Sequence, residues 1–212
     1  MHAAPRLRGG WVVRSIWLVT GLFLCALGIL AFLESKLGLP PWDVLHQGIA
    51  KHTPLSFGLA NEAVALAVLV LAWRLGAVLG PGTVANAALI GVFVAVVEPW
   101  HTVQRLETWP LGARVALLFA GLALFGVGTA FYIGASMGAG PRDSLMLVGA
   151  ARAGVRIGVS RATLEGSVLV VGFLLGGRVG LGTVLFALAI GPAVEGSFWL
   201  AARSPLVESP PL

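Results

Sequence analysis

Two aspartates in matching surroundings are the residues of this sequence best suited to chemistry. Asp43 ends the segment Gly38-Leu-Pro-Pro-Trp-Asp43, and Asp143 ends Gly138-Ala-Gly-Pro-Arg-Asp143, directly after Arg142. Glycine and proline end helices, and aspartate is a common N-cap, so each segment predicts a short capped helix, Val44–Lys51 or Ser144–Arg152. Such a helix could lie on the membrane surface. Alternatively, it could re-enter the membrane and direct its N-terminal amides at an anion in a cavity.

Glutamates inside long apolar runs form a second group of candidates. Glu165 and Glu195 lie deep in their runs, whereas Glu62 lies near the end of its run. A charge at membrane depth costs several kcal/mol unless it is paired or hydrated, so such residues often line a substrate or ion pathway. We therefore expect Glu165 and Glu195 to form a proton or cation site. A structural ion pair with Arg161 or Arg178 is the alternative.

A third candidate is the element Gly80-x-Gly82-Thr83, which recurs as Gly180-x-Gly182-Thr183. Thr83 and Thr183 are expected to be N-caps of the helices that follow, and the glycines allow a tight turn. Asn86, just inside the first of these helices, could donate a hydrogen bond between helices. These residues complete the candidate pathway, although a plain inter-helix turn would explain the Gly-x-Gly pattern equally well.

Signatures of other chemistry are missing from the sequence. It contains no HExxH, no GxSxG and no Cys/His metal cluster, so we expect no enzyme activity, no catalytic residue, no metal and no cofactor. His46, His52 and His101 are expected to be solvated at loops or helix edges. Cys25, the single cysteine, is expected to be a buried apolar residue.

The composition places these residues in a membrane. Of the 212 residues, 58% are hydrophobic and only 11% are charged, against about 25% charged in soluble domains. Apolar runs of about 20 residues predict transmembrane helices. We expect six of them: about Val12–Leu33, Gly58–Leu79, Val84–Trp100, Gly112–Ala135, Val159–Leu175 and Val184–Ala201.

The strongest pattern is an internal repeat at an offset of 100 residues. Without gaps, 25 of the 85 positions in 14–98 are identical to those in 114–198, where a shuffled chain would give roughly nine. The matches include Pro41, Asp43 and Thr83 with Pro141, Asp143 and Thr183. The chain is therefore expected to be a duplication of one three-helix unit.

An odd number of spans per unit places the second copy upside down in the membrane. The predicted fold is an all-α membrane protein with six transmembrane helices as two inverted three-helix repeats. We expect a cytoplasmic N-terminal tail at 1–13, repeat 1 at 14–100, a linker at 101–113, repeat 2 at 114–201 and a C-terminal tail at 202–212.

Basic residues predict the orientation. With the N-terminus inside, nine of the 14 Lys and Arg residues fall on the inner side and five on the outer side, which favours cytoplasmic N- and C-termini in the cell membrane. The arginines form no basic stripe, so we expect no nucleic-acid partner. The expected partners are the lipid bilayer and a small solute or ion. Small-xxx-small patterns such as Gly172–Gly176 would allow close helix packing within the chain or in a homodimer.

Four motifs together resemble the bacterial YczE/YitT-type integral membrane proteins. They are Gly-Leu-x-Leu-x-Ala-Leu-Gly at 21–28, Pro-Trp-Asp-Val-Leu-His-Gln-Gly at 41–48, Gly-Ala-Gly-Pro-Arg-Asp-Ser-Leu at 138–145, and Gly-Thr-Val-Leu-Phe-Ala-x-x-Ile-Gly-Pro at 182–192. The resemblance implies a bacterial cytoplasmic membrane location and a multi-span helical fold, and it supplies no site residues. The repeat and the buried glutamates favour an alternating-access transporter of a small solute or ion. A non-transporting accessory or scaffold protein is the alternative.

Overall fold

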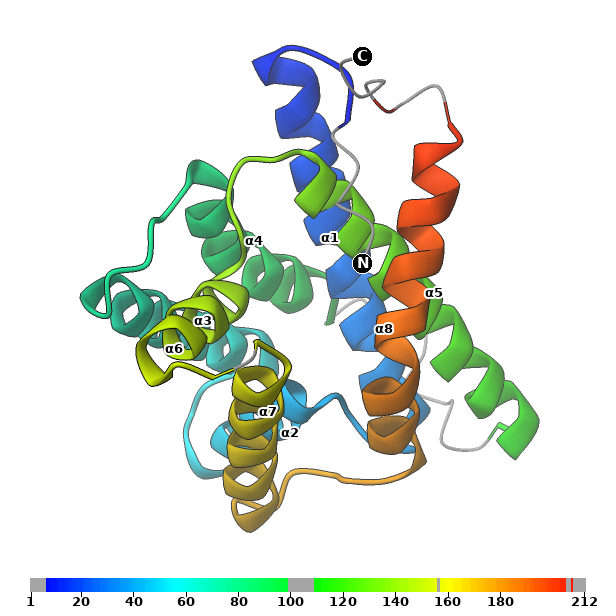
Figure 1. Ribbon diagram of the computed structural model, residues 1–212. Coiled ribbons are helices and arrows are strands. Elements are labelled where there is room, and N and C mark those ends of the chain that lie inside the picture. Colours follow the sequence, from blue (N-terminus) through cyan, green and yellow to red (C-terminus); the bar gives the residue numbers. More distant parts are fainter. Residues whose placement is uncertain (1–6, 99–108, 156, 205–206, 208–212) are drawn as a thin grey trace.

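The computed structural model describes residues 7–98, 109–155, 157–204 and 207. In these residues the chain forms eight α-helices and no strand (Figure 1). The helices are α1 Trp11–Ser35, α2 Pro41–His52, α3 Phe57–Arg74, α4 Pro81–Val97, α5 Leu111–Gly134, α6 Pro141–Ala153, α7 Ile157–Leu174 and α8 Leu181–Ala202. The predicted linker at 101–108, the end of the predicted span at Trp100, the C-terminal tail beyond 207, and the basic residues Arg6, Arg105 and Arg156 lie outside the described residues.

The helix boundaries repeat with the offset that the sequence repeat has. The helices α1 to α4 begin at residues 11, 41, 57 and 81, and α5 to α8 begin at 111, 141, 157 and 181. Each repeat is therefore one long helix, one short helix and two further helices. The short helices that the sequence predicted after the Gly/Pro segments are α2 and α6.

The two long helices α1 and α5 cross in antiparallel directions through glycine. A Cβ added to Gly21 would lie 2.6 Å from the carbonyl oxygen of Gly128, and one added to Gly28 would lie 2.9 Å from that of Gly121. The order of the contacts reverses along the two helices, so α1 and α5 run in opposite directions, as Figure 1 shows. Backbone approaches backbone here because neither helix carries a side chain at the crossing.

Contacts between the repeats are reciprocal. Arg14 donates from Nε to the carbonyl of Ala135 at 2.6 Å, and Arg114 donates from Nε to that of Ser35 at 2.8 Å. The two bonds join counterpart residues: Arg114 is the counterpart of Arg14, and Ser35 is the counterpart of Ala135. A two-fold axis relates contacts of this kind.

The segments before α4 and α8 repeat the pattern. The Gly82 N–H donates to Met137 at 2.8 Å, and the Gly182 N–H donates to Leu37 at 2.9 Å. Gly38 and Gly138 lie against Gly180 and Gly80 and have φ of 120° and 127°, a backbone conformation that favours glycine. The conserved spacing of these glycines in the two repeats thus follows from close approach between the repeats.

The prediction that aspartate and threonine cap helices is wrong at all four positions. The residues before α2 and α6 are Pro40 and Gly140, and Asp43 and Asp143 lie in the first turn, each two residues after a proline at the first helical position. Proline at this position needs no N–H donor, so the helix starts there without a side-chain cap. The aspartates are therefore free to bond elsewhere.

Thr83 and Thr183 are the third residues of α4 and α8, after Gly80 and Gly180. Their hydroxyls accept from the N–H of these two glycines at 3.1 and 3.2 Å. The threonine thus bonds back to the residue before the helix, as the third residue of a capping box does. The prediction placed each threonine too early in its helix.

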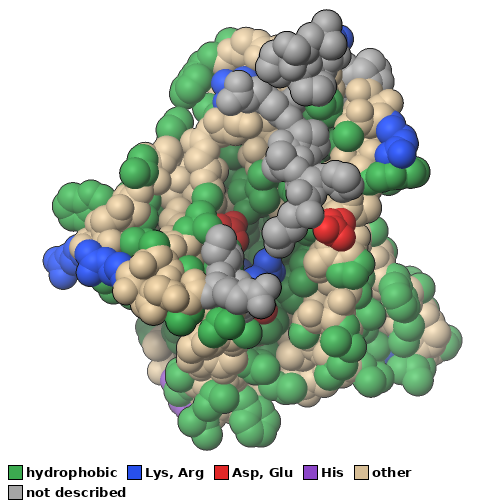
Figure 2. Space-filling model, in the orientation of Figure 1, with side chains coloured by type: hydrophobic (Ala, Val, Ile, Leu, Met, Phe, Trp, Pro, Cys, Tyr) green, Lys and Arg blue, Asp and Glu red, His purple; other side chains and the backbone are tan. Residues whose placement is uncertain are grey.

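The outside of the molecule is apolar. Val78, Leu174 and Leu188 are 94%, 77% and 74% exposed, and hydrophobic side chains cover most of the face in Figure 2. Within the described residues, α1, α3, α5 and α8 are long and apolar enough to cross a membrane, and α4 is a shorter apolar helix. So large an exposed apolar area needs a lipid environment.

The repeats differ in the pairing of their last two helices. The helices α3 and α4 pack closely, because a Cβ at Gly91 would lie 2.7 Å from the carbonyl oxygen of Gly58. The corresponding helices α7 and α8 barely touch, and a Cβ at Gly191 would meet open space. Figure 1 shows α7 and α8 diverging from the loop that joins them. Repeat 1 is therefore closed between α3 and α4, whereas repeat 2 is open between α7 and α8.

The glycine crossing generates a stability prediction. In Gly21→Ala the new methyl group meets the α5 backbone, and overpacking of this kind costs about 1–3 kcal/mol. We expect a melting temperature in detergent several degrees below that of the wild type. The matched control is Gly166→Ala in α7, where the added Cβ meets open space, so the melting temperature should stay equal or rise. Equal melting temperatures for the two variants would contradict the assigned crossing.

Candidate functional site

A cavity of about 590 Å³ lies between the two repeats and takes residues from all eight helices. Its size is in the range of small-molecule sites. Eight positions of repeat 1 line it together with their counterparts in repeat 2. They are Cys25 and Phe125, Ile29 and Thr129, Pro40 and Gly140, Trp42 and Arg142, Asn61 and Arg161, Ala65 and Glu165, Asn86 and Phe186, and Ile90 and Ile190. The cavity therefore lies where the two repeats meet.

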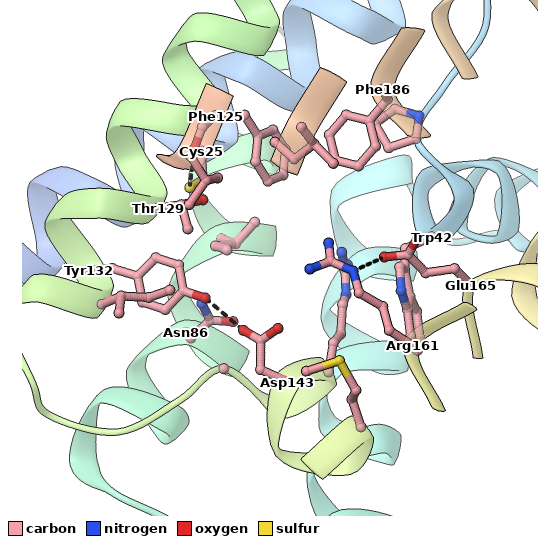
Figure 3. Close-up of a pocket in the computed structure, with 18 of the residues that line it drawn as sticks. Cys25, Trp42, Asn86, Phe125, Thr129, Tyr132, Asp143, Arg161, Glu165 and Phe186 are labelled. Atoms are coloured by element: carbon pink, nitrogen blue, oxygen red, sulfur yellow. Dashed lines mark hydrogen bonds and ion pairs between the residues drawn. The ribbon is translucent and has the colours of Figure 1, made fainter. Parts of the chain in front are cut away.

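Asp143 presents a carboxylate to this cavity, as Figure 3 shows. The Tyr132 hydroxyl donates to Asp143 Oδ2 at 2.7 Å, and among the described residues Oδ1 has no hydrogen-bond partner. Tyr132 comes from the last turns of α5 and is 7% exposed, so packing fixes its ring. The tyrosine positions the carboxylate and leaves one oxygen available.

Arg142, the neighbour of Asp143, supplies a cation to the same wall. Its guanidinium carbon lies 4.9 Å from the centre of the Trp42 ring, and one terminal nitrogen lies 3.4 Å from Nε2 of His46. Burial lowers the pKa of Arg142, and the nearby carboxylates of Asp43 and Asp143 act in the opposite direction. Arginine keeps its charge under such conditions. The positive charge is thus held by an aromatic face and two carboxylates.

Asp43 lies behind this wall rather than in it. It is 1% exposed, and its Oδ1 lies 3.0 Å from Nδ1 of His46, while Asn61 Nδ2 lies 3.1 Å from the same nitrogen. Because arginine can only donate, Nε2 of His46 accepts from Arg142 and the ring proton belongs on Nδ1, where it is donated to Asp43. A protonated Nδ1 cannot accept from Asn61, so the Asn61 amide contacts the ring without a hydrogen bond from Nδ2 to Nδ1. The chain Asp43–His46–Arg142 links α2 to α6.

The prediction that His46 is solvated is wrong. The side chain is 0% exposed, and this burial lowers its pKa, opposed by the hydrogen bond with Asp43. His52, by contrast, is exposed as predicted, and His101 lies outside the described residues. The helix α2 is buried along with His46: Trp42 and Val44 are 9% and 0% exposed. It is a packed internal helix rather than one lying on the surface.

The two glutamates of the candidate pathway reach the cavity from α7 and α8. Glu165 accepts from Arg161 Nε at 2.9 Å, which is the ion pair left open as an alternative, and both residues line the cavity (Figure 3). Glu195 lines it as well and is exposed. The structure thus brings Asp143, Arg142, Glu165, Glu195 and Asn86 together around one space.

The remaining candidates lie elsewhere. Glu62 lies against Gly91 between α3 and α4, outside the cavity lining, and its Oε2 is buried without a hydrogen-bond partner among the described residues. Thr83 and Thr183 are buried at the helix starts described above. Asn86 lines the cavity with no hydrogen bond to another described residue, so the expected inter-helix bond is absent there. Cys25 is 1% exposed, as predicted for a small apolar residue.

Sequence reasoning missed four residues of this site: Tyr132, His46, Asn61 and Trp42. Each differs from its counterpart 100 positions away in the other repeat. The counterparts are Phe32, Met146, Arg161 and Arg142, respectively. A search for repeat positions where one copy is polar and the other is not would have found Tyr132 and His46. Trp42, which lies under the Arg142 guanidinium, has no such signal in the sequence.

Helices with apolar outer faces, around a cavity whose mostly apolar lining includes several charged side chains, define a helical membrane protein. The chain belongs to a family of unknown function (DUF6198), whose model matches residues 12–197. It is 38% identical over 207 residues to an uncharacterized protein of Haemophilus influenzae (strain ATCC 51907 / DSM 11121 / KW20 / Rd), covering 93% of each chain. It is 30% identical to the uncharacterized membrane protein YczE of Bacillus subtilis (strain 168), covering 85% of this chain and 83% of YczE. The resemblance to YczE-like membrane proteins is thereby confirmed.

A third relative is the uncharacterized protein YyaS of Bacillus subtilis (strain 168), which is 27% identical over 78% of this chain and 82% of its own. No solved structure matches the chain.

The buried histidine generates a prediction about pH. Since burial lowers its pKa, folded His46 stays neutral where the unfolded side chain, with a pKa of about 6.5, takes up a proton. Stability should therefore fall as the pH drops from about 7.5 to 5.5. In detergent, the melting temperature of His46→Gln should fall less over this range than that of the wild type. The matched control is the exposed His52→Gln, which should follow the wild type; a His46→Gln curve parallel to the wild type would contradict the assignment.

Proposed function

We propose that this chain is an alternating-access transporter of a small solute or ion, and that it catalyses no reaction of its own. The supporting observation is the cavity lined by counterpart positions of the two repeats, closed between α3 and α4 and open between α7 and α8. A site shared by two equivalent halves can be exposed by either half in turn.

In this proposal six helices cross the membrane, namely α1, α3, α4, α5, α7 and α8. The first and second sets of three have opposite orientations, as the antiparallel α1 and α5 and the reciprocal bonds between the repeats suggest. The buried α2 and its counterpart α6 would re-enter the membrane, and their first turns would lie at the cavity. The domain boundaries follow those expected from the sequence.

The orientation rests on the distribution of basic residues. Their bias favours cytoplasmic N- and C-termini in the cell membrane. The turn after α2 would then face outward and the turn after α6 would face the cytoplasm. The space between α7 and α8 would be the entrance in the conformation of this structure.

The second conformation follows from the repeat. If α7 and α8 closed as α3 and α4 do, Gly191 would meet α7 in the way that Gly91 now meets Gly58 and Glu62. The counterpart of Glu62 is Ala162, whose small side chain leaves room for this contact. Opening of α3 from α4 would expose the same cavity on the other side.

Cysteine labelling tests the inverted arrangement. In a Cys25→Ala background, single cysteines replace the exposed Thr53 after α2 and the exposed Ala153 at the end of α6. A membrane-impermeant maleimide added to intact cells should label Thr53→Cys, and should label Ala153→Cys only after permeabilisation. Labelling of both positions from one face would rule out the inverted arrangement and the transport mechanism built on it.

Cross-linking tests the second conformation. The double variant Ala162→Cys with Gly191→Cys, in the same background, should form a cross-link in native membranes, because the two positions meet only when α7 and α8 close. Reduction should reverse it. The two single variants, treated identically, are the controls. A static accessory protein with the structure seen here would give no cross-link.

Flux measurements decide between transport and the accessory role. Reconstituted protein should move at least one solute of a broad panel, and Glu165→Ala or Glu195→Ala should lower that rate. If no solute moves, both variants behave as the wild type in cells, and a stoichiometric partner co-purifies, the chain is an accessory protein.

A further inference from the structure

We propose that the cavity binds a small organic cation with an apolar body, and that Asp143 contacts its positive group. The inference deepens the proposed transport function by naming a class of substrate. Binding can be measured on purified protein without any flux, so it can fail or hold separately.

The charges around the cavity favour a cation. Of the described residues, Arg142 and Arg161 bring positive charge to the lining, and Asp143, Glu165 and Glu195 bring negative charge. Asp43 adds a buried carboxylate directly behind Arg142. The pair of Arg161 with Glu165 is neutral as a whole. Arg142 then faces two carboxylates, and Glu195 has no ion-pair partner among the described residues. The lining of the cavity therefore carries excess negative charge, which is costly in an apolar surrounding.

An anionic ligand would make this imbalance larger. The guanidinium of Arg142 is already stacked on Trp42 and directed toward His46, with Asp43 and Asp143 nearby. A bound carboxylate or phosphate would join two existing negative charges around a single positive one. A bound cation instead balances one of these negative charges. Electrostatics therefore favours a cationic ligand over an anionic one.

The available hydrogen-bond acceptors line the same cavity. Oδ1 of Asp143 has no partner among the described residues, while Tyr132 holds the other oxygen at 2.7 Å. The side-chain amide of Asn86 also lines the cavity without a hydrogen bond to a described residue. A carboxylate oxygen and an amide oxygen are the acceptors that an ammonium group needs.

The rest of the wall suits an apolar body. Phe125 and Phe186 lie edge to face with ring centres 5.3 Å apart, and Ile90 and Ile190 continue the surface. Aromatic rings also attract a cation through their faces. The described acidic groups are not gathered into a cluster that could hold a metal ion. The combination of one placed carboxylate and aromatic walls matches an organic ammonium.

Isothermal titration of the full chain in detergent tests this class directly. The probe is protonated benzylamine, which carries the N–H donors that these acceptors need, with benzyl alcohol as the neutral comparison and phenylacetate as the anionic one. We expect the cation to bind at least tenfold more tightly than either.

Variants locate the site. Asp143→Asn should lower the affinity for protonated benzylamine at least tenfold, whereas Asp143→Glu should retain part of it. Both variants are first shown to be monodisperse and to melt as the wild type does, and Asp143→Glu keeps the test valid if Asp143→Asn fails to fold. The matched control is Glu34→Gln, which changes a carboxylate at the end of α1 outside the cavity lining and should leave the affinity unchanged.

Two results would overturn the proposal. Tighter binding of phenylacetate would mean an anion site governed by Arg142, and unchanged cation affinity in Asp143→Asn would mean that the cation binds elsewhere. Cation binding without flux in any assay would remove transport and leave the ligand class intact. Flux of other solutes without cation binding would remove the ligand class and leave transport intact.

Discussion

The contact between the backbones of α1 and α5 is the constraint on which the rest of the structure depends. Gly21 faces Gly128 and Gly28 faces Gly121, so the two longest helices approach as closely as their main chains allow. This crossing brings the residues at 25, 29, 125 and 129 to the seam and thus sets one wall of the cavity. A larger side chain at the crossing would separate the repeats and move both ends of every bond that joins them.

Burying the polar groups between the two repeats is tolerated only because these groups are bonded to one another. Asp43 is bonded to His46, His46 accepts from Arg142, and Arg142 lies over Trp42. Removing one partner would leave a buried charge without compensation, which costs several kcal/mol. Tyr132 and Asp143 belong to the same wall, so the charge that faces the cavity is held by groups that are themselves fixed by packing.

The sequence predicted much of the fold because the membrane leaves few solutions. Apolar runs, Gly/Pro breaks and the 100-residue offset located the eight helices of the described residues to within three residues, except that α3 ends at Arg74, five residues before the predicted Leu79. It misplaced the helix caps, because proline at the first helical position removed the need for them at Asp43 and Asp143. The grouping of Asp143, Glu165 and Glu195 could be proposed from their depth. The burial of His46 could not, since a histidine on a short helix is solvated or buried depending on what packs over it.

The open space between α7 and α8 could not be predicted either. The two repeats share the glycines that pack α3 on α4, so the sequence favours equal packing in both. The shared glycines therefore do not decide by themselves how each pair of helices packs. Such a difference is visible only in a structure.

The bonds from Gly82 to Met137 and from Gly182 to Leu37 carry a consequence for how the chain is made and how it arose. Neither half contains the acceptor for its own donor, so the first half must wait in the bilayer, with its glycine face uncovered, until the ribosome has delivered the second. If the repeats are inverted as proposed, a single-repeat ancestor would have met the same need by inserting in both directions and pairing as a two-fold dimer. Gene fusion would then have converted a matter of chance encounter into a fixed order of synthesis.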